Sequence, residues 1–270
     1  MIHQNYLNLQ EKDIDRPIYR IFSVDFFFEL FKENELTLVR PSMWDDPFEN
    51  FVLNSKKVYK DGRVVYWGNR THLYGQCWSF KKEDDALWRV YSPKKESIQV
   101  STTPRKLFEC IYNQVNNKDE GVFIGKVRYL NLKELRKQIF DIDDVLKDKK
   151  YWGYNYYKTI ANSLLIKRTI FSYENEVRII YNSLGHENEQ LEAHNKEDKY
   201  SGLKHFKIDP LSLFDSITVD SRIGESEFAK INKRIKNYGF NGEISKSKLY
   251  DIPGFKYKTT EDFDIIHRNA

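Results

Sequence analysis

Residues 171–181, Phe-Ser-Tyr-Glu-Asn-Glu-Val-Arg-Ile-Ile-Tyr, constrain the fold more than any other part of the chain. Their pattern predicts a β-strand, in which successive side chains point to opposite faces. Glu174, Glu176 and Arg178 would then share one face, and Val177, Ile179 and Tyr181 the other. The polar face is either an exposed sheet surface with a cross-strand ion pair or the wall of a catalytic cleft.

The rest of the chain mixes strand-like and helix-like segments without a regular βαβ order. Strands are predicted at 18–22, 36–39, 74–80, 97–102, 206–209, 214–220 and 243–250, and residues 121–130 are predicted to form either a strand pair or one long strand. Helices are predicted at 24–33, 84–91, 104–116, 132–139, 156–166 and 225–237. Residues 41–50 are rich in turn formers. This pattern predicts an α+β fold, with a mixed, mostly antiparallel sheet core and flanking helices.

Composition indicates a globular protein, because 40% of the 270 residues are hydrophobic and 31% are charged. With no linker-like run, we expect one domain over 1–270, with 1–16 peripheral and the polar stretch 185–201 a mobile loop. The two cysteines match no disulfide framework, and no apolar run approaches membrane-spanning length. We therefore expect a cytoplasmic protein without a signal peptide or a membrane partner. The sequence leaves the oligomeric state open.

The net charge of +4 is nearly balanced and does not favour a heavily phosphate-coated partner. A local basic run, Lys230 to Lys236, is either the solvated face of a helix or a nucleic-acid contact. The chain has no Gly-rich phosphate loop and no nucleophile elbow. Its six histidines are scattered without metal-ligand spacing, so we predict no metal site. Carboxylates and arginines remain as the candidates for chemistry.

Three of these candidates, together with one serine, lie outside the acidic strand. Asp46 and Glu49 either cap turns or line the same cleft as Glu176. Arg20, in the first predicted strand, needs an anionic partner, which is one of those two acids or a ligand diphosphate that its two-pronged guanidinium can bind. Ser79 is either a satisfied strand residue or a hydroxyl that orients a carboxylate.

Taken together, these motifs resemble a bacterial family of unknown function, DUF2971. The resemblance runs from Tyr19 to about Leu249, and its most specific parts are the Asp-Pro-Phe-Glu loop and the Glu-x-Glu-x-Arg strand. The motifs that carry it are Ile18-Tyr-Arg20, the run 36–49, Cys77-Trp-Ser79, Trp88-x-x-Tyr91 and Glu174-x-Glu176-x-Arg178.

A second resemblance suggests an activity. An Arg on the first strand, a Ser on a middle strand and Glu-x-Glu on a late strand is similar to the arrangement in ADP-ribosyltransferases, although the usual Ser-Thr-Ser triplet is absent. The resemblance implies that Arg20 binds the diphosphate of NAD, Ser79 braces the site and Glu176 is catalytic. Glu174 would position or deprotonate the acceptor.

The same resemblance implies an ADP-ribosyltransferase-like fold and NAD as the consumed substrate. Tyr19, Tyr74 or Trp78 would stack on the nicotinamide ring. The acceptor would be a protein or a nucleic acid, and the enzyme a toxin or a phage-defence effector. Further cleft candidates are Asp46, Glu49 and Arg178.

Two other functions are compatible with the sequence. One is a non-catalytic or nucleic-acid-binding module of a bacterial defence system, which would bind through Lys230, Lys233, Arg234 and Lys236. The other is a metal-dependent nuclease using Asp46, Glu174 and Glu176 with Mg²⁺. The nuclease lacks a lysine two positions beyond Glu176, where Arg178 stands instead.

Overall fold

The structure is a computed structural model that describes residues 4–66, 71–115, 121–147, 153–183, 202–252 and 254. Among these residues, ten strands form the main sheet in the order β1-β8-β11-β6-β2-β7-β13-β14, with β3 joined to β6 and β12 to β3. Their bounds are β1 Tyr6–Leu7, β2 Ile18–Ser23, β3 Glu35–Val39, β6 Leu73–Ser79, β7 Ser97–Thr102, β8 Val122–Lys126, β11 Glu176–Asn182, β12 Leu203–Lys207, β13 Ser216–Val219 and β14 Glu243–Lys246.

Most neighbouring strands of this sheet run antiparallel, whereas β1 with β8 and β13 with β14 are parallel. Two smaller sheets pair β9 (Arg128–Leu130) with β10 (Ile166–Arg168) and β4 (Lys56–Val58) with β5 (Val64–Tyr66). The predicted fold class, α+β with a mostly antiparallel sheet, is therefore confirmed.

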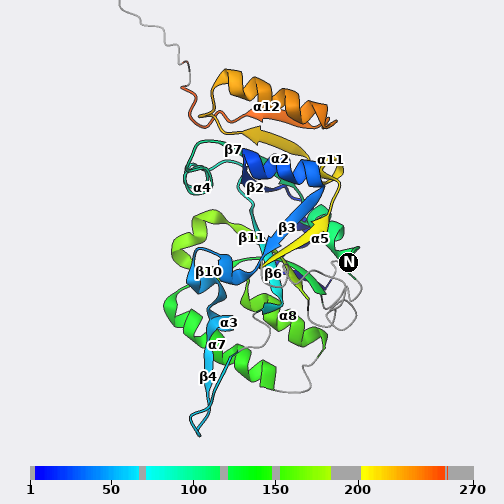
Figure 1. Cartoon of the computed structure of the whole chain (residues 1–270). Coiled ribbons are helices and arrows are strands. Elements are labelled where there is room, and N and C mark those ends of the chain that lie inside the picture. Colours follow the sequence, from blue (N-terminus) through cyan, green and yellow to red (C-terminus); the bar gives the residue numbers. More distant parts are fainter. Residues whose placement is uncertain are drawn as a thin grey trace, which may run out of the picture.

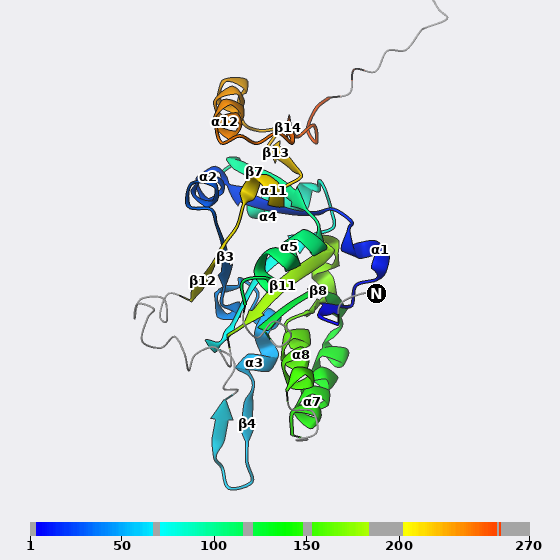
Figure 2. The same cartoon turned by 90° about the vertical axis from the view of Figure 1, so that its right-hand side faces the viewer.

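Helices flank the sheet on both sides and at its ends (Figures 1 and 2). The α-helices are α1 Glu11–Ile14, α2 Val24–Glu33, α3 Phe51–Asn54, α4 Asp85–Tyr91, α5 Pro104–Tyr112, α7 Leu132–Lys147, α8 Tyr154–Ser163, α11 Pro210–Leu213 and α12 Glu225–Asn237. Short 3-10 helices are η1 Pro41–Met43, η2 Pro47–Asn50 and η5 Thr169–Glu174. In both views α12 and β14 lie at one end of the molecule and β4 projects at the other.

The predicted alternation along β11 places its two faces against different helices. Val177 and Ile179 belong to the apolar core that also contains Leu107 of α5. Ile180, on the opposite face, belongs to a second core with Ile160 of α8. Because Glu176 and Arg178 share the face of Ile180, the polar end of β11 lies on the α8 side of the sheet. This face is buried, so the expectation of an exposed sheet surface is wrong.

The predicted strand 171–181 is too long at its start. Residues 169–174 form η5, and Asn175 adopts a left-handed conformation at φ 45° before β11 begins at Glu176. Asn tolerates this conformation better than most residues. Glu174 therefore precedes the strand and does not belong to it.

Other boundaries also differ from the predictions. Segment 121–130 forms two strands, as one of its two predicted alternatives has it, but β8 and β9 belong to different sheets. The helix predicted at 156–166 ends at Ser163, and Ile166 begins β10. The helix predicted at 132–139 continues to Lys147, and the strand predicted at 243–250 ends at Lys246. The loop predicted at 185–201 lies outside the described residues. None of the described helices is long and apolar enough to cross a membrane.

The main sheet is split between β2 and β6, at the position of the candidate site. Strands β2 and β6, both described throughout, pair only at Tyr19 and Ser79. Strand β2 pairs with β7 over its whole length, and β6 pairs with β11 over its whole length. Adjacent strands that diverge leave side chains without a partner strand between them, and the Arg20 side chain spans this opening to the Cys77 carbonyl. The sheet topology thus opens a space between two strands at its centre.

Candidate functional site

A pocket lies where β2 and β6 diverge, and it brings together the three residues that carry the transferase resemblance. Arg20 of β2, Ser79 of β6 and Glu176 of β11 all line it. The cavity volume of the pocket is about 40 Å³. The space between atoms in and around it, which includes open solvent, is about 410 Å³. The other lining residues are Tyr19, Ile21, Cys77, Trp78, Lys81, Leu87, Tyr91, Gln99 and Glu174.

Arg20 supplies a positive charge to one wall of the pocket. One of its terminal nitrogens donates to the Cys77 carbonyl oxygen, and the guanidinium lies 5.1 Å from the centre of the Phe22 ring. Its Nε is buried without a hydrogen-bond partner. Arg20 forms no ion pair with any described residue, so the expected alternative of a pair with Asp46 or Glu49 is not observed. The charge remains available to an anion.

Ser79 holds the acidic segment against β6. Its hydroxyl donates a 2.5 Å hydrogen bond to the backbone carbonyl of Glu174 and accepts one of 3.0 Å from the Lys81 N–H. The next residue, Phe80, donates its N–H to the carbonyl of Asn175 at 3.0 Å. These bonds place Glu174 at the pocket although it lies outside the strand. Ser79 thus acts on the site through the backbone.

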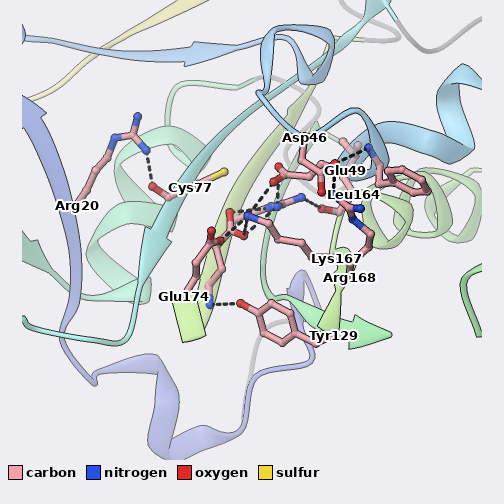
Figure 3. A network of polar contacts seen from close by, with 12 residues as sticks. Arg20, Asp46, Glu49, Cys77, Tyr129, Leu164, Lys167, Arg168 and Glu174 are labelled. Atoms are coloured by element: carbon pink, nitrogen blue, oxygen red, sulfur yellow. Dashed lines mark hydrogen bonds and ion pairs between the residues drawn. The ribbon is translucent and has the colours of Figure 1, made fainter. Parts of the chain in front are cut away.

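Five buried charged side chains meet behind the pocket: Glu49, Lys167, Glu174, Glu176 and Arg178. The Lys167 ammonium lies 2.8 Å from Glu49 and 3.5 Å from Glu176, and it donates a short hydrogen bond to Glu174. Three carboxylates against two cations give this ion cluster a net charge of −1 when all are ionised. Figure 3 shows Lys167 pointing among the carboxylates, with Arg20 on the far side of Cys77.

Arg178 anchors the ion cluster from β11. Its guanidinium donates to both carboxylate oxygens of Glu176, at 2.8 and 2.9 Å, and to Glu49 at 2.9 Å. A further bond of 2.6 Å reaches the carbonyl of Leu164 at the end of α8, and Trp44 stacks 4.5 Å away. The side chain is completely buried. Since these polar contacts tie the guanidinium to partners on three elements, Arg178 orients Glu176 toward the pocket.

The two glutamates at the pocket differ in their electrostatic surroundings. Burial alone would raise the pKa of Glu176, but the charges of Arg178 and Lys167 hold its pKa well below the usual range. For Glu174, burial outweighs the attraction of Lys167, and its pKa is raised. Carboxyl pairs whose pKa values are pushed apart are suited to different chemical roles. Glu176 is a fixed anion, whereas Glu174 can exchange a proton nearer to neutral pH.

Cys77 lies beside these acids and does not act as a nucleophile in its ordinary state. Burial and the negative charge of Glu176 raise the pKa of its thiol well above the usual value. A thiol is reactive as its thiolate. The surroundings of Cys77 therefore disfavour the reactive form.

The aromatic candidates are placed differently from one another. The Trp78 ring packs in the apolar core, and its indole N–H donates to Gln76 at 2.9 Å. Tyr74 is also buried in that core and does not line the pocket. Tyr19 lines the pocket and is half-buried. Tyr91 of α4, which sequence reasoning missed, also lines the pocket and is 45% exposed.

The acids of the 41–50 loop stand outside the pocket wall. Asp46 accepts from the Phe48 N–H at the start of η2, which is the predicted turn-capping role, and it pairs with Arg168 at 3.1 Å. Glu49 lies in the ion cluster behind the pocket. Arg168 follows Lys167 directly in β10, so adjacent residues of one strand pair with Asp46 and Glu49.

Lys167 is the main residue of the site that sequence reasoning missed. A lysine directly after the apolar run Leu164-Leu165-Ile166 is an available signal, because a charge there must either leave the core or find partners within it. Tyr129 is a second missed residue, and its hydroxyl accepts the Glu176 N–H at 2.9 Å. Both act behind the pocket wall.

The geometry bears on the two other functions considered from the sequence. Asp46 binds Arg168, whereas Glu174 and Glu176 bind Lys167, so the three acids of the nuclease hypothesis do not converge on one open site. In the part of the chain that is described, no group of three His, Cys, Asp or Glu side chains is arranged to hold a metal ion. On α12, Lys230 pairs with Glu227, and Arg234 lies over the Phe28 ring.

Comparison with known proteins supports the first resemblance over part of the chain. The family model for proteins of unknown function DUF2971 matches residues 87–179, from α4 into β11. The match includes two of the motifs noted in the sequence, Trp88-x-x-Tyr91 and Glu174-x-Glu176-x-Arg178. The Asp-Pro-Phe-Glu loop lies outside it. A search of curated proteins found no match.

Among solved structures, the chain is similar to DarT of Thermus sp. 2.9. The structure in complex with carba-NAD+ has a TM-score of 0.37 at 11% identity, over 89% of this chain and 98% of that one. The structure in complex with ADP-ribosylated single-stranded DNA has a TM-score of 0.39 at 11% identity, over 90% and 98%.

Proposed function

We propose that this protein is an ADP-ribosyltransferase-like enzyme that consumes NAD. The observation that carries the proposal is the convergence of Arg20, Ser79 and Glu176 on one pocket. They come from three strands far apart in the sequence, and sheet topology alone brings them together. A cation with an unsatisfied buried nitrogen on one wall and a fixed carboxylate on the other suits a substrate with an anionic and a cationic part.

In the proposed complex, the diphosphate of NAD lies at the Arg20 end of the pocket, where the guanidinium can donate to two phosphate oxygens. The nicotinamide riboside lies toward Glu176, with the Tyr19 ring as a stacking surface. The pocket is narrow, with a cavity volume of about 40 Å³. We therefore propose that the α4 wall, which carries the exposed Tyr91, moves outward when NAD binds.

The reaction begins with cleavage of the bond between the ribose C1′ and the nicotinamide nitrogen. The bonding electron pair leaves with nicotinamide, which becomes neutral, and C1′ becomes an oxocarbenium-like cation. The Glu176 carboxylate, kept ionised by Arg178, stabilises that cation. An oxygen or nitrogen of the acceptor then bonds to C1′ and gives its proton to Glu174. The raised pKa of Glu174 suits it to accept this proton.

Binding of NAD tests the proposal without knowledge of the acceptor. Saturation-transfer NMR would measure contact between NAD and the wild-type protein, and chromatography would measure nicotinamide release. R20A should weaken binding, and E176Q should abolish release. The matched controls are R16A, whose guanidinium stacks on Phe80 away from the pocket lining, and E49Q, which removes a carboxylate from the same ion cluster behind the pocket wall.

The controls separate function from folding. E49Q removes a partner of Lys167 and Arg178, as E176Q does, so both should destabilise the fold. If only E176Q loses nicotinamide release, the loss reflects the pocket and not the fold. Absence of any NAD contact with the folded wild-type protein would refute the proposal, whatever the acceptor is.

A further inference from the structure

We propose that Lys167 is the positioning residue of this site: it joins Glu174 to Glu176 and Glu49 and holds the two pocket carboxylates in the unlike roles of proton acceptor and fixed anion. The inference rests on the proposed function for its chemical meaning. It adds a residue that neither the sequence motifs nor the lining of the pocket indicate. Lys167 touches neither the pocket nor a substrate, so it would act through the glutamates.

The geometry places Lys167 at the junction of four elements. It projects from β10 and meets Glu49 of η2, Glu174 of η5 and Glu176 of β11. Of these three acids, Glu174 is the one that Arg178 does not bind. Its backbone is held by Ser79 and its carboxylate by Lys167, while Arg178 binds only the other two acids. Without Lys167, the Glu174 carboxylate would lose its bound cation.

Burial makes this contact consequential. The side chain of Lys167 is 5% exposed, that of Glu174 7% and that of Glu176 4%. An ammonium group buried so deeply must be compensated by opposite charge. The attraction of Glu176 and Glu49 outweighs burial and raises the pKa of Lys167, so it stays charged. In return, its charge opposes the rise in the pKa of Glu174 that burial causes.

Other charged and titratable groups also face Glu174 and must be considered. On its own helix, Tyr173 lies nearby, and β11 contributes Glu176 and Arg178. From other elements come Glu49 on η2, Tyr91 on α4 and Tyr129 on β9. Among the groups that influence Glu174, the Lys167 ammonium is the cation that bonds to it directly. Its removal should therefore move the titration of Glu174 more than any other single change.

Titration of the glutamate carboxyls by ¹³C NMR tests this role without NAD. The Glu174 signal would be identified by its loss in E174Q. In K167M the midpoint of Glu174 should rise by about 1 to 3 pH units, the range expected for loss of an adjacent opposite charge. K167R, which keeps the charge, should leave the midpoint near that of the wild type. The pH profile of nicotinamide release should shift in the same direction.

The double variant K167M/E49Q separates local contact from cluster charge. K167M changes the net charge of the ion cluster from −1 to −2, and the added E49Q returns it to −1. We expect the Glu174 midpoint to stay raised in the double variant, because the contact with the ammonium is still missing. A midpoint restored to the wild-type value would overturn the proposal, since charge balance alone would then explain the effect.

Three further outcomes have defined meanings. An unchanged Glu174 midpoint in folded K167M would overturn the proposal. Failure of both K167M and the double variant to fold at any pH would also overturn it, because Lys167 would then be a structural residue. A wild-type protein that shows the expected titrations but never binds NAD would refute the proposed function and leave the positioning contact intact.

Discussion

Replacement of Arg178 by Met should lower the free energy of unfolding more than a comparable change at the surface. Arg178 donates three hydrogen bonds to carboxylate oxygens and is completely buried. Hydrogen bonds to charged groups contribute roughly 1.5–3 kcal/mol each. The sum for the three bonds is an upper limit on the loss of stability. Lys167 remains as a partner for both acids. We therefore expect a loss of about 3–5 kcal/mol, the usual range for a broken buried pair.

The loss should depend on pH in a defined direction. In the wild type, the lowered pKa of Glu176 adds stability above the ordinary glutamate pKa, and this stability disappears as the pH falls through the lowered value. In R178M the buried carboxyl lacks its guanidinium, so its pKa moves above the ordinary value. The folded variant then loses stability as the pH rises. The difference between the two proteins should grow from about pH 2, where the wild type begins to gain stability, up to roughly pH 7, as the variant loses it.

Urea denaturation at several pH values, followed by circular dichroism, would measure both effects. R168M is the matched control, because Arg168 follows a cluster residue, pairs with Asp46 and stacks on Phe48, yet is 30% exposed. We expect it to lower the free energy of unfolding by about 1 kcal/mol or less. If R178M is no worse than R168M, or if its loss is the same at every pH, the ion cluster does not stabilise the fold as argued.

Three further changes address other links between sequence and structure. S79A should lower stability by about 1–3 kcal/mol by leaving the Glu174 carbonyl unpaired, and should reduce nicotinamide release; full release with unchanged stability would remove Ser79 from the site. D84A should cost about 1 kcal/mol in urea denaturation, since Asp84 caps α4, and D84N should restore most of it. G125A should destabilise the fold by about 1–3 kcal/mol or more, because its Cβ would lie 2.3 Å from Leu165; an unchanged melting temperature would contradict that close approach.

Local signals in the sequence determined several elements closely. Helix α2 begins and ends at the predicted residues, because Ser23 caps its first turn and Asn34 ends it in a left-handed conformation at φ 53°. The alternation from Glu176 onward was equally readable, since a strand's period depends only on the chain itself. The turn before β11 could not be predicted, because Asn175 is an ambiguous signal within a run that otherwise resembles a strand.

The candidate site divides in the same way. Arg20, Ser79, Glu174 and Glu176 could be selected from residue type and order, and the structure places all four at one pocket. The sequence does not indicate that Asp46 binds Arg168 outside the pocket or that Trp78 packs in the core. Both placements depend on which strands pair and on which side of the sheet each residue falls. A single sequence without aligned relatives contains little information on pairing between distant strands.

Lys167 shows the limit most clearly. Alone, the sequence determined that Glu176 and Arg178 share one face of a strand, and it selected Glu174, Arg20 and Ser79 as residues suited to a shared cleft. Tertiary structure decided that a lysine from β10 meets three glutamates from three other elements. The physical reason is that buried charges must be compensated in space, and neighbours in space are set by strand order and helix packing, not by distance along the chain.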